Sequence, residues 1–317
     1  MTVAARTKRL QSAGSERLRE ALVGYAFILI PMGIFGVFFL YPMAYAFYVS
    51  AHDWGGLTGN TGYVGLDNFR DVYHDKQFWD WPPHFHSGTA LWNTFYYAVL
   101  VVPLQMALGL TVAVVVNQNI RGRGFFRSAF YFPALTSSVA ITAIAIYLLN
   151  ANGFLNSVIS KIIGHDYHHP WFGDSSTALE SIVGLNAWTT SGTMMLFYLA
   201  ALQSIPTDVY EAAAIDAAGR WRTFWKITFP LLKPAHFFVL VVSLIGALKI
   251  FDQAWIVSSG SGGPAGSTET AVLYLYTVTI GEFNYGYGAA IGVVLFLIIF
   301  TLTLIQRLLF GKAEIGY

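Results

Sequence analysis

The sequence predicts an all-α integral membrane protein with six transmembrane helices and both termini in the cytoplasm. Three observations support this fold class: the composition, a series of long uncharged segments, and the alternating distribution of basic residues. The chain has 317 residues, of which 55% are hydrophobic and only 11% are charged. Soluble domains carry about 25% charged residues, so the deficit is typical of a protein that lies largely in lipid.

Six segments lack Asp, Glu, Lys and Arg, and five of them are long enough to cross a bilayer, which takes about 20 residues. The fifth in order ends at Lys249, but apolar character resumes through Val257. The segments are Ala21–His52, Ala90–Ile120, Ser128–Ser160, Ser181–Thr207, Pro234–Leu248 and Phe283–Gln306. They predict transmembrane helices at residues 22–49, 93–117, 128–150, 182–204, 235–257 and 287–309.

Basic residues alternate between the two sides that these helices define. Fourteen of the 18 fall in the N-terminal tail, the second and fourth connections, and the C-terminal tail. They are Arg6, Lys8, Arg9, Arg17, Arg19, Arg121, Arg123, Arg127, Arg220, Arg222, Lys226, Lys233, Arg307 and Lys312. Lys and Arg favour the cytoplasmic side, so we expect cytoplasmic tails at residues 1–21 and 311–317 and a transmembrane domain at 22–310.

Several classes of function are excluded by residues that the sequence lacks. A net charge of +1 gives no field for nucleic acid, and the absence of cysteine removes thiol catalysis and thiolate metal sites. A P-loop needs G-x-x-x-x-G-K-[ST], and the only Gly-Lys pair, Gly311-Lys312, lacks the other positions. Energy for any pumping must therefore come from another subunit.

Two other kinds of protein remain as alternatives. A metal-dependent membrane enzyme could use loop histidines, namely His84, His86, His165, His168 and His169, although these are also compatible with solvated loops. A channel would need polar or charged rings along a pore. Apart from Arg307 at the end of the last span, the only charges within a predicted span are Lys249 and Asp252, whose i, i+3 spacing allows them to pair.

A polar stripe runs along the fourth predicted helix. Asn186, Thr189, Thr190 and Thr193 have the spacing i, i+3, i+4, i+7, which places them on one helical face. Such residues either line a binding site or hold membrane helices together. The periodicity alone does not separate these two interpretations.

The connection between the fourth and fifth spans, from Tyr210 to Pro234, is unusually polar and helix-forming. The run "EAAAIDAA" has high helix propensity, with Thr207 as the predicted N-cap and Gly219 as the predicted residue that ends the helix. "RWRTFWKI" predicts a second short helix before Pro230. The segment is either an amphipathic linker on the membrane surface or a docking element for a cytosolic partner.

This connection resembles the EAA loop of binding-protein-dependent ABC importer permeases. The matching positions are Glu211-Ala212-Ala213, Asp216, Gly219, Phe224, Ile227, Pro230 and Pro234. The family usually has Gly directly after the Asp, whereas Ala217 stands here, so we expect the turn to fall at Gly219. "YPMAYAFYVSAHDW", "LQSIP" and "FDQAWIV…GGP…STETAVLYLY" resemble the MalF-type subunits of carbohydrate importers.

The resemblance implies a permease subunit of the bacterial or archaeal inner membrane. Its implied partners are a MalG-type second permease, two ATPase subunits, an extracytoplasmic solute-binding protein and membrane lipid. No cofactor would be bound by this chain, since ATP would be used by the partner ATPase. The implied coupling loop covers residues 207–234, and its ATPase-coupling residues are Tyr210, Glu211, Ala212, Ala213, Asp216, Gly219, Phe224 and Pro230.

The resemblance also implies a substrate pocket between the fourth and fifth helices. Its lining residues would be Asn186, Thr189, Thr190 and Thr193 on one helix and Ser243, Gly246, Ala247 and Ile250 on the other. Lys249 beside Asp252 favours a neutral di- or oligosaccharide. The alternative substrate is glycerol-3-phosphate or a related polyol phosphate.

Overall fold

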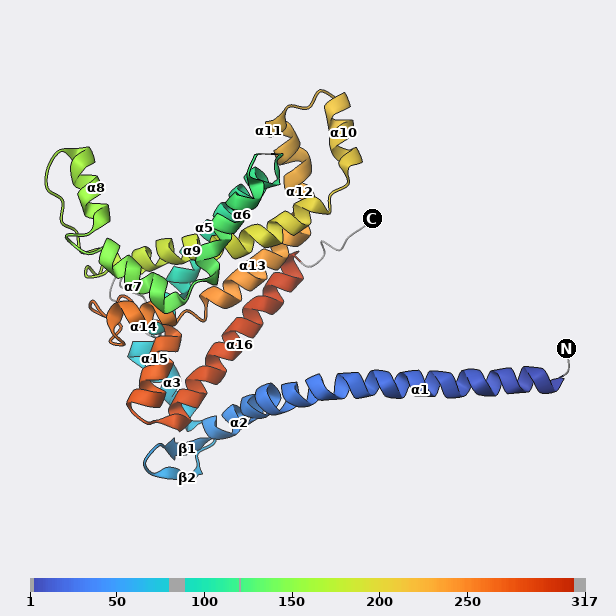
Figure 1. The fold of residues 1–317 in the computed structure, drawn as a ribbon. Helices are drawn as coiled ribbons and strands as arrows, with labels where there is room; N and C mark the ends of the chain where they lie inside the picture. The colour runs from blue at the N-terminus through green and yellow to red at the C-terminus, as the bar shows by residue number, and fades with distance from the viewer. Residues whose placement is uncertain (1–2, 80–88, 120, 311–317) are drawn as a thin grey trace.

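The computed structural model describes residues 3–79, 89–119 and 121–310, and side chains from residue 19 onward. Its first element, α1 (Val3–Phe35), continues through a π-helical turn, η1 (Gly36–Leu40), into α2 (Tyr41–Ser50). Helix α1 projects away from all the other helices (Figure 1). No side chain between Arg19 and Tyr48 is buried by the rest of the chain, although Phe47 near the end of this span contacts the ring of Phe296.

A small β-hairpin follows α2 at one end of the molecule, a detail that the sequence did not predict within the mostly helical chain. Strands β1 (His52–Gly55) and β2 (Gly59–Tyr63) pair antiparallel, with an irregular register between Asp53 and Trp54. Short helices α3 (Asp67–His74) and α4 (Lys76–Trp79) come next. Asn68 Nδ2 on α3 donates to the carbonyl oxygens of Ser50 and His52, each at 2.9 Å, and so fixes the hairpin to the end of α2.

Two long helices form the centre of the structure. Helix α5 (Ala90–Asn117) packs along α9 (Ala178–Gln203), and they share buried side chains that include Tyr97, Val101 and Ile182. At Gly109 a Cβ would come within 2.5 Å of Met194 Cβ, so glycine permits the close approach of the two backbones. Small residues serve this purpose between helices in membranes, where hydrophobic burial between helices gives little driving force.

The predicted third span is bent rather than straight. Helix α6 (Arg123–Leu135) and helix α7 (Ser138–Leu148) meet at 95°. The break falls at Thr136 and Ser137, whose ψ angles of 146° and 130° are extended rather than helical. Sequence composition predicted a single helix at 128–150 because both halves are apolar, but it gave no sign of the bend.

The predicted fifth span is also interrupted. Helix α13 (Lys233–Ala247) ends before Lys249, and α14 (Asp252–Ser258) begins after Phe251, which has φ −140° and ψ −59°. The hydroxyl of Thr270 donates to the Ile250 carbonyl at 3.0 Å, so a carbonyl freed by the break keeps a hydrogen-bond partner. Non-helical backbone at membrane depth is tolerated only where such partners exist.

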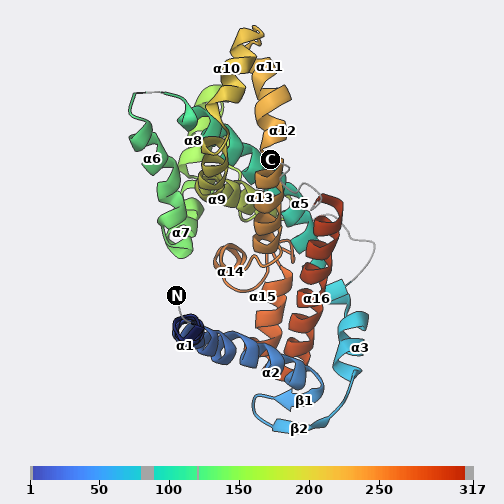
Figure 2. The same ribbon diagram turned by 90° about the vertical axis from the view of Figure 1, so that its right-hand side faces the viewer.

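The remaining helices complete the two ends. Helix α8 (Phe154–Ile163) follows α7, while α15 (Ala271–Tyr276) with η3 (Thr277–Gly281) leads into the last long helix, α16 (Tyr285–Phe310). Between α9 and α13 lie α10 (Thr207–Ile215), α11 (Arg220–Thr223), η2 (Phe224–Thr228) and α12 (Phe229–Leu231). Helices α10 and α11 stand at the end of the molecule opposite the β-hairpin (Figures 1 and 2).

An acidic network ties the loops on the hairpin side to α15 and α16. Asp75 Oδ2 accepts hydrogen bonds from the hydroxyls of Tyr274, at 2.5 Å, and Tyr287. Gln77 Nε2 donates to both carboxylate oxygens of Glu269, at 3.0 and 3.1 Å. Burial of Glu269 raises the pKa of its carboxyl above the ordinary value. These contacts hold α3, α4 and the loop before α15 together.

Among the described residues, four helices are long and apolar enough to cross a membrane, or five if α6 and α7 form one bent span. The four are Arg19–Ser50, Ala90–Asn117, Lys233–Ser258 and Tyr285–Phe310. Helix α9 has the length, with 26 residues, but its Glu180 and its polar stripe lower its hydropathy. Several apolar spans are therefore present, as the composition predicted.

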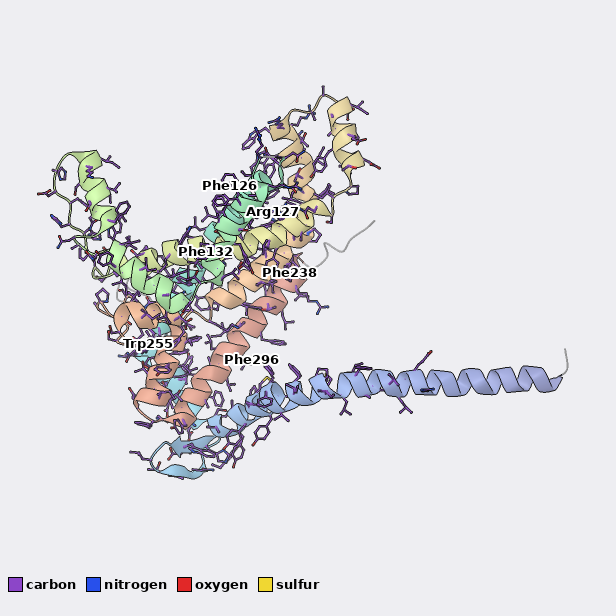
Figure 3. The ribbon with its side chains drawn as sticks, in the orientation of Figure 1. Phe126, Arg127, Phe132, Phe238, Trp255 and Phe296 are labelled. Carbon is purple, nitrogen blue, oxygen red and sulfur yellow. The ribbon has the colours of Figure 1, made fainter. Side chains whose placement is uncertain are left out.

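Large apolar side chains remain exposed on the helices that surround the centre. Figure 3 shows Phe132 on α6, Phe238 on α13, Trp255 on α14 and Phe296 on α16, and each of these side chains is at least 41% exposed. Apolar surface of this extent marks contact with lipid or with another protein. These apolar side chains are therefore left uncovered by the rest of the chain.

We predict that Gly192→Ala destabilises the crossing of α6 over α9. A Cβ at Gly192 would collide with the Phe130 carbonyl oxygen and come within 2.9 Å of Tyr131 Cα, both of which belong to the α6 backbone. Overpacking of this kind costs about 1–3 kcal/mol, so the midpoint of thermal unfolding in detergent should fall. Gly184→Ala is the matched control on the same helix, because a Cβ there meets nothing within 4 Å. Equal midpoints for the two variants would show that this crossing does not need glycine.

Candidate functional site

A cavity of about 360 Å³ lies between α5, α9, α13 and the start of α14. Helix α9 contributes Asn186, Thr190 and Met194, which follow each other at intervals of four residues along one ridge. The other walls come from the middle of α5 and from the C-terminal part of α13 with the residues that follow it. The cavity therefore sits beside the interruption of the predicted fifth span.

Six of the eight predicted lining residues meet at this cavity: Asn186, Thr190, Ser243, Gly246, Ala247 and Ile250. Thr189 and Thr193 do not line it. Thr189 is buried, and its hydroxyl donates to the Asn186 carbonyl at 3.2 Å, which is a packing role. The predicted polar stripe is therefore split. Asn186 and Thr190, four residues apart, face the cavity, whereas Thr189 and Thr193 do not.

Helix α5 supplies polar groups to the site that the sequence analysis missed. Asn186 Nδ2 donates to Tyr97 Oη at 2.5 Å, and the Thr190 hydroxyl approaches Gln105 Oε1 at 2.6 Å. Tyr97 and Gln105 are buried and line the cavity. Gln105 lies in the interior of an apolar segment, and this signal could have identified α5 as a wall of the site.

The charged residues of the interrupted helix, Lys249 and Asp252, both line the cavity and are both exposed to it or to solvent. No ion pair joins these two described side chains. The predicted pairing assumed a continuous helix, but helical geometry ends at Ala247 and resumes at Asp252, so the i, i+3 relationship is lost. The cavity therefore carries one cationic and one anionic group that are not neutralised by each other.

The two helix interruptions are linked directly. Gln253 Nε2, in the first turn of α14, donates to the hydroxyl of Ser138, the first residue of α7, at 2.8 Å. Gln253 also lines the cavity. Backbone breaks in two different spans thus meet beside one polar cavity, an arrangement found in transporters that bind their substrates inside the membrane.

The loop at residues 207–234 forms two helical parts, and Tyr210 connects them. The second part continues through η2 and α12 past Pro230 to Leu231, so the prediction that it ends before Pro230 was wrong. The Tyr210 hydroxyl lies 3.4 Å from the Thr228 hydroxyl, across the loop. Thr207 is the first helical residue rather than the cap, since Pro206 precedes the helix and offers no side-chain hydrogen bond. The predicted capping position was therefore wrong by one residue.

The outer face of α10 combines acidic and apolar side chains. Glu211, Ala212 and Asp216 are exposed, and Ile215 is 86% exposed, although it is a large apolar residue. Ala213, in contrast, is buried with only 5% of its surface exposed, so it packs inside the chain. Phe224 begins the π-helical turn η2, and Pro230 lies in α12.

The turn that ends α10 falls at Ala217 and not at Gly219, so the predicted position was wrong. Ala217 has φ +51°, in the left-handed region, whereas Gly219 has φ −65° and is the residue before α11. The Ala218 amide donates to the Ala213 carbonyl at 2.9 Å, as in a Schellman motif with Ala217 at the C′ position. This is the position directly after Asp216.

The loop histidines do not assemble into a metal site within the part of the chain that the structure describes. No group of three or more His, Asp or Glu side chains comes together there. His165 and His168 contact backbone carbonyls, and His169 Nε2 lies 2.8 Å from the Thr177 hydroxyl. His84 and His86 lie outside the described residues.

We predict that Ala217→Val loosens the turn between α10 and α11. A left-handed conformation costs an L-residue about 1–2 kcal/mol, and a β-branched side chain fits there worst. Trypsin should therefore cut at Arg220 and Arg222 faster in Ala217→Val than in the wild type, while Ala217→Gly should be protected. Ala214→Val is the control, because Ala214 is exposed and helical, so Val costs at most about 0.7 kcal/mol. Faster cleavage of Ala217→Gly than of the wild type would contradict the assigned turn.

Comparisons with known proteins show the family of this chain. Residues 105–314 match the family described as the binding-protein-dependent transport system inner membrane component. The trehalose/maltose transport system permease protein MalF of Thermococcus litoralis is 32% identical over 258 residues, which cover 81% of this chain and 83% of that protein. The sn-glycerol-3-phosphate transport system permease protein UgpA of Escherichia coli is 31% identical over 255 residues, 80% of this chain and 82% of UgpA.

A solved structure shows the same fold. A chain in the crystal structure of a bacterial alginate ABC transporter, bound to a periplasmic protein with alginate pentasaccharide, superposes with a TM-score of 0.76 at 21% identity. The superposition covers 92% of this chain and 95% of that chain. The chain belongs to the family of binding-protein-dependent transport system inner membrane components, and it is a multi-pass membrane transport subunit rather than an enzyme.

Proposed function

We propose that this chain is the MalF-type permease subunit of an ATP-driven importer that carries a neutral di- or oligosaccharide. It crosses the inner membrane six times, with α9 as one span and the α6–α7 pair as another, and both termini lie in the cytoplasm. The transmembrane domain covers residues 22–310, and the coupling loop covers residues 207–234. The distribution of basic residues supports this orientation, because it places α10 and α11 on the cytoplasmic side.

The partners follow from the family and from the free surfaces of the chain. A MalG-type second permease would complete the translocation pathway, two ATPase subunits would supply the energy, and an extracytoplasmic solute-binding protein would deliver the sugar. The exposed acidic and apolar face of α10, formed by Glu211, Ala212 and Ile215, suits the ATPase contact. Truncating one partner of a desolvated charged contact typically costs about 2–5 kcal/mol.

One observation carries the assignment of the substrate site: the polar cavity between α5, α9 and α13. Its amide, hydroxyl and phenol groups, on Gln105, Asn186, Thr190, Ser243 and Tyr97, can exchange hydrogen bonds with sugar hydroxyls. A ring of such groups inside an apolar helical bundle is costly unless a polar ligand or internal partners satisfy it.

Helix α9 would connect this cavity to the ATPase. It is continuous from Ala178 to Gln203, carries Asn186 and Thr190 at the cavity, and leads into α10 through Ser204–Pro206. A movement of α10 would therefore reach the cavity through one rigid helix. This is the mechanical link that an energy-coupled importer needs.

A second candidate substrate is glycerol-3-phosphate or a related polyol phosphate. Lys249 favours it, because this cation lines the cavity without an ion pair to Asp252. The relative UgpA is named for this substrate. Uptake of labelled maltose in the presence of excess glycerol-3-phosphate separates the candidates. Glycerol-3-phosphate should not inhibit uptake through a pocket that binds neutral sugars.

We predict that Asn186→Leu lowers sugar uptake while the transporter complex still assembles. Removing a polar interaction inside the bilayer costs about 1–2 kcal/mol, which corresponds to a roughly 5- to 30-fold increase in the half-saturation concentration. Thr193→Val is the matched control on the same helix, because Thr193 lies outside the cavity. The measurement is uptake into proteoliposomes that contain the purified complex. Unchanged half-saturation in Asn186→Leu would show that this side chain only packs helices.

A further inference from the structure

A second, larger groove of about 960 Å³ lies on the outer side of α5, α11 to α13 and the end of α16. It is separate from the polar cavity, since none of the α9 residues that line that cavity also lines the groove. The lining residues of α5 and of its C-cap run from Val102 to Gln118, which corresponds to about 24 Å along the helix axis. This length is close to the depth of one leaflet with its headgroups, about half of 40–45 Å.

The lining of the groove changes from apolar to polar along its length. Val102, Pro103 and Met106 on α5 form the end that lies deepest in the membrane, and Leu240 faces the same region from α13. Gln118, Arg220 and Lys233 lie at the opposite end. Helices α5 and α13 run in opposite directions, and both place their polar residues at this end.

The polar end has the residues expected at the level of lipid headgroups. Trp221 is 76% exposed and Trp225 is 50% exposed, and both line the groove. Tryptophan is enriched at membrane interfaces, and basic side chains beside it attract anionic headgroups. Arg220 and Lys233 are exposed and belong to the basic connection that the charge pattern assigns to the cytoplasm.

One turn deeper than Lys233, His236 also lines the groove, and its Nδ1 lies 3.1 Å from the Tyr198 hydroxyl. This contact joins α13 to α9 along the wall of the groove.

From this arrangement we propose that the groove is a binding site for an anionic phospholipid of the cytoplasmic leaflet. Arg220 and Lys233 pair with the phosphate, and an acyl chain lies against Met106, Leu110 and Leu240. The site is independent of the transported substrate. It adjoins the coupling loop, because α11 and η2 form one of its walls.

The test uses the fact that this chain contains no cysteine. A fluorescent bimane label is attached at Ala107→Cys, an exposed position that lines the groove, in the assembled transporter with cysteine-free partner subunits. Phosphatidylglycerol or phosphatidylcholine with a nitroxide on the acyl chain is then titrated into nanodiscs, and quenching reports occupancy. We expect phosphatidylglycerol to quench at much lower mole fraction than phosphatidylcholine.

Two pairs of charge variants distinguish binding at this site from the general electrostatic attraction of anionic lipid to the basic loop. The double variant Arg220→Gln with Lys233→Gln should lower the preference for phosphatidylglycerol over phosphatidylcholine by about 30-fold. This factor is equivalent to about 1 kcal/mol for each basic side chain. Arg222→Gln with Lys226→Gln removes the same charge from the same loop, but neither residue lines the groove, so the preference should persist. Equal quenching by the two lipids, or an equal decrease in both pairs of variants, would overturn the proposal. Absence of quenching by either lipid would also overturn it, because a protein helix would then fill the groove.

Discussion

The structure depends most on the contact between α5 and α9. This contact combines a glycine that lets the backbones approach, at Gly109, with two polar links inside the membrane, Asn186 to Tyr97 and Thr190 to Gln105. Burial between helices gives little energy in lipid, so close packing and hydrogen bonds must hold them. The same polar links line the cavity, and therefore the interactions that stabilise the centre also build the candidate substrate site.

The interrupted helices give the cavity its remaining features. A continuous fifth span would pair Lys249 with Asp252 and leave no free backbone near the site. The break instead presents both charges to the cavity, while Thr270 satisfies the Ile250 carbonyl and Gln253 reaches the bend between α6 and α7. Because the bend and the break share this contact, movement of α7 and movement of α14 are mechanically connected. Such irregular backbone is costly in lipid and is stable only where protein groups compensate it.

The positions of the apolar segments and of the polar connection at residues 207–234 could be predicted from the sequence, because hydropathy and charge depend on composition over about 20 residues. Six of the eight residues predicted from helical periodicity and the family resemblance line the cavity. The bend at Thr136 could not be predicted, because it depends on tertiary contacts and does not change the local composition. The sequence carries a signal at the other two irregularities, since Lys249 ends an uncharged segment and Ala217 stands where the family usually has Gly, but neither signal alone places the break or the turn. Tyr97 and Gln105 were missed for a related reason, because their role depends on which helix packs against α9.

The central claim is that the cavity beside Asn186 lies on the transport pathway and opens alternately to the two sides of the membrane. Gly246→Cys tests it directly, because Gly246 lines the cavity, a Cβ there meets nothing within 4 Å, and the chain has no other cysteine. The measurement is labelling by a membrane-impermeant maleimide, applied to either side of proteoliposomes that contain the whole transporter, with and without trapped ATP. The account predicts that the accessible side changes with the nucleotide state. Labelling from the same side in both states, or from neither side, would contradict it.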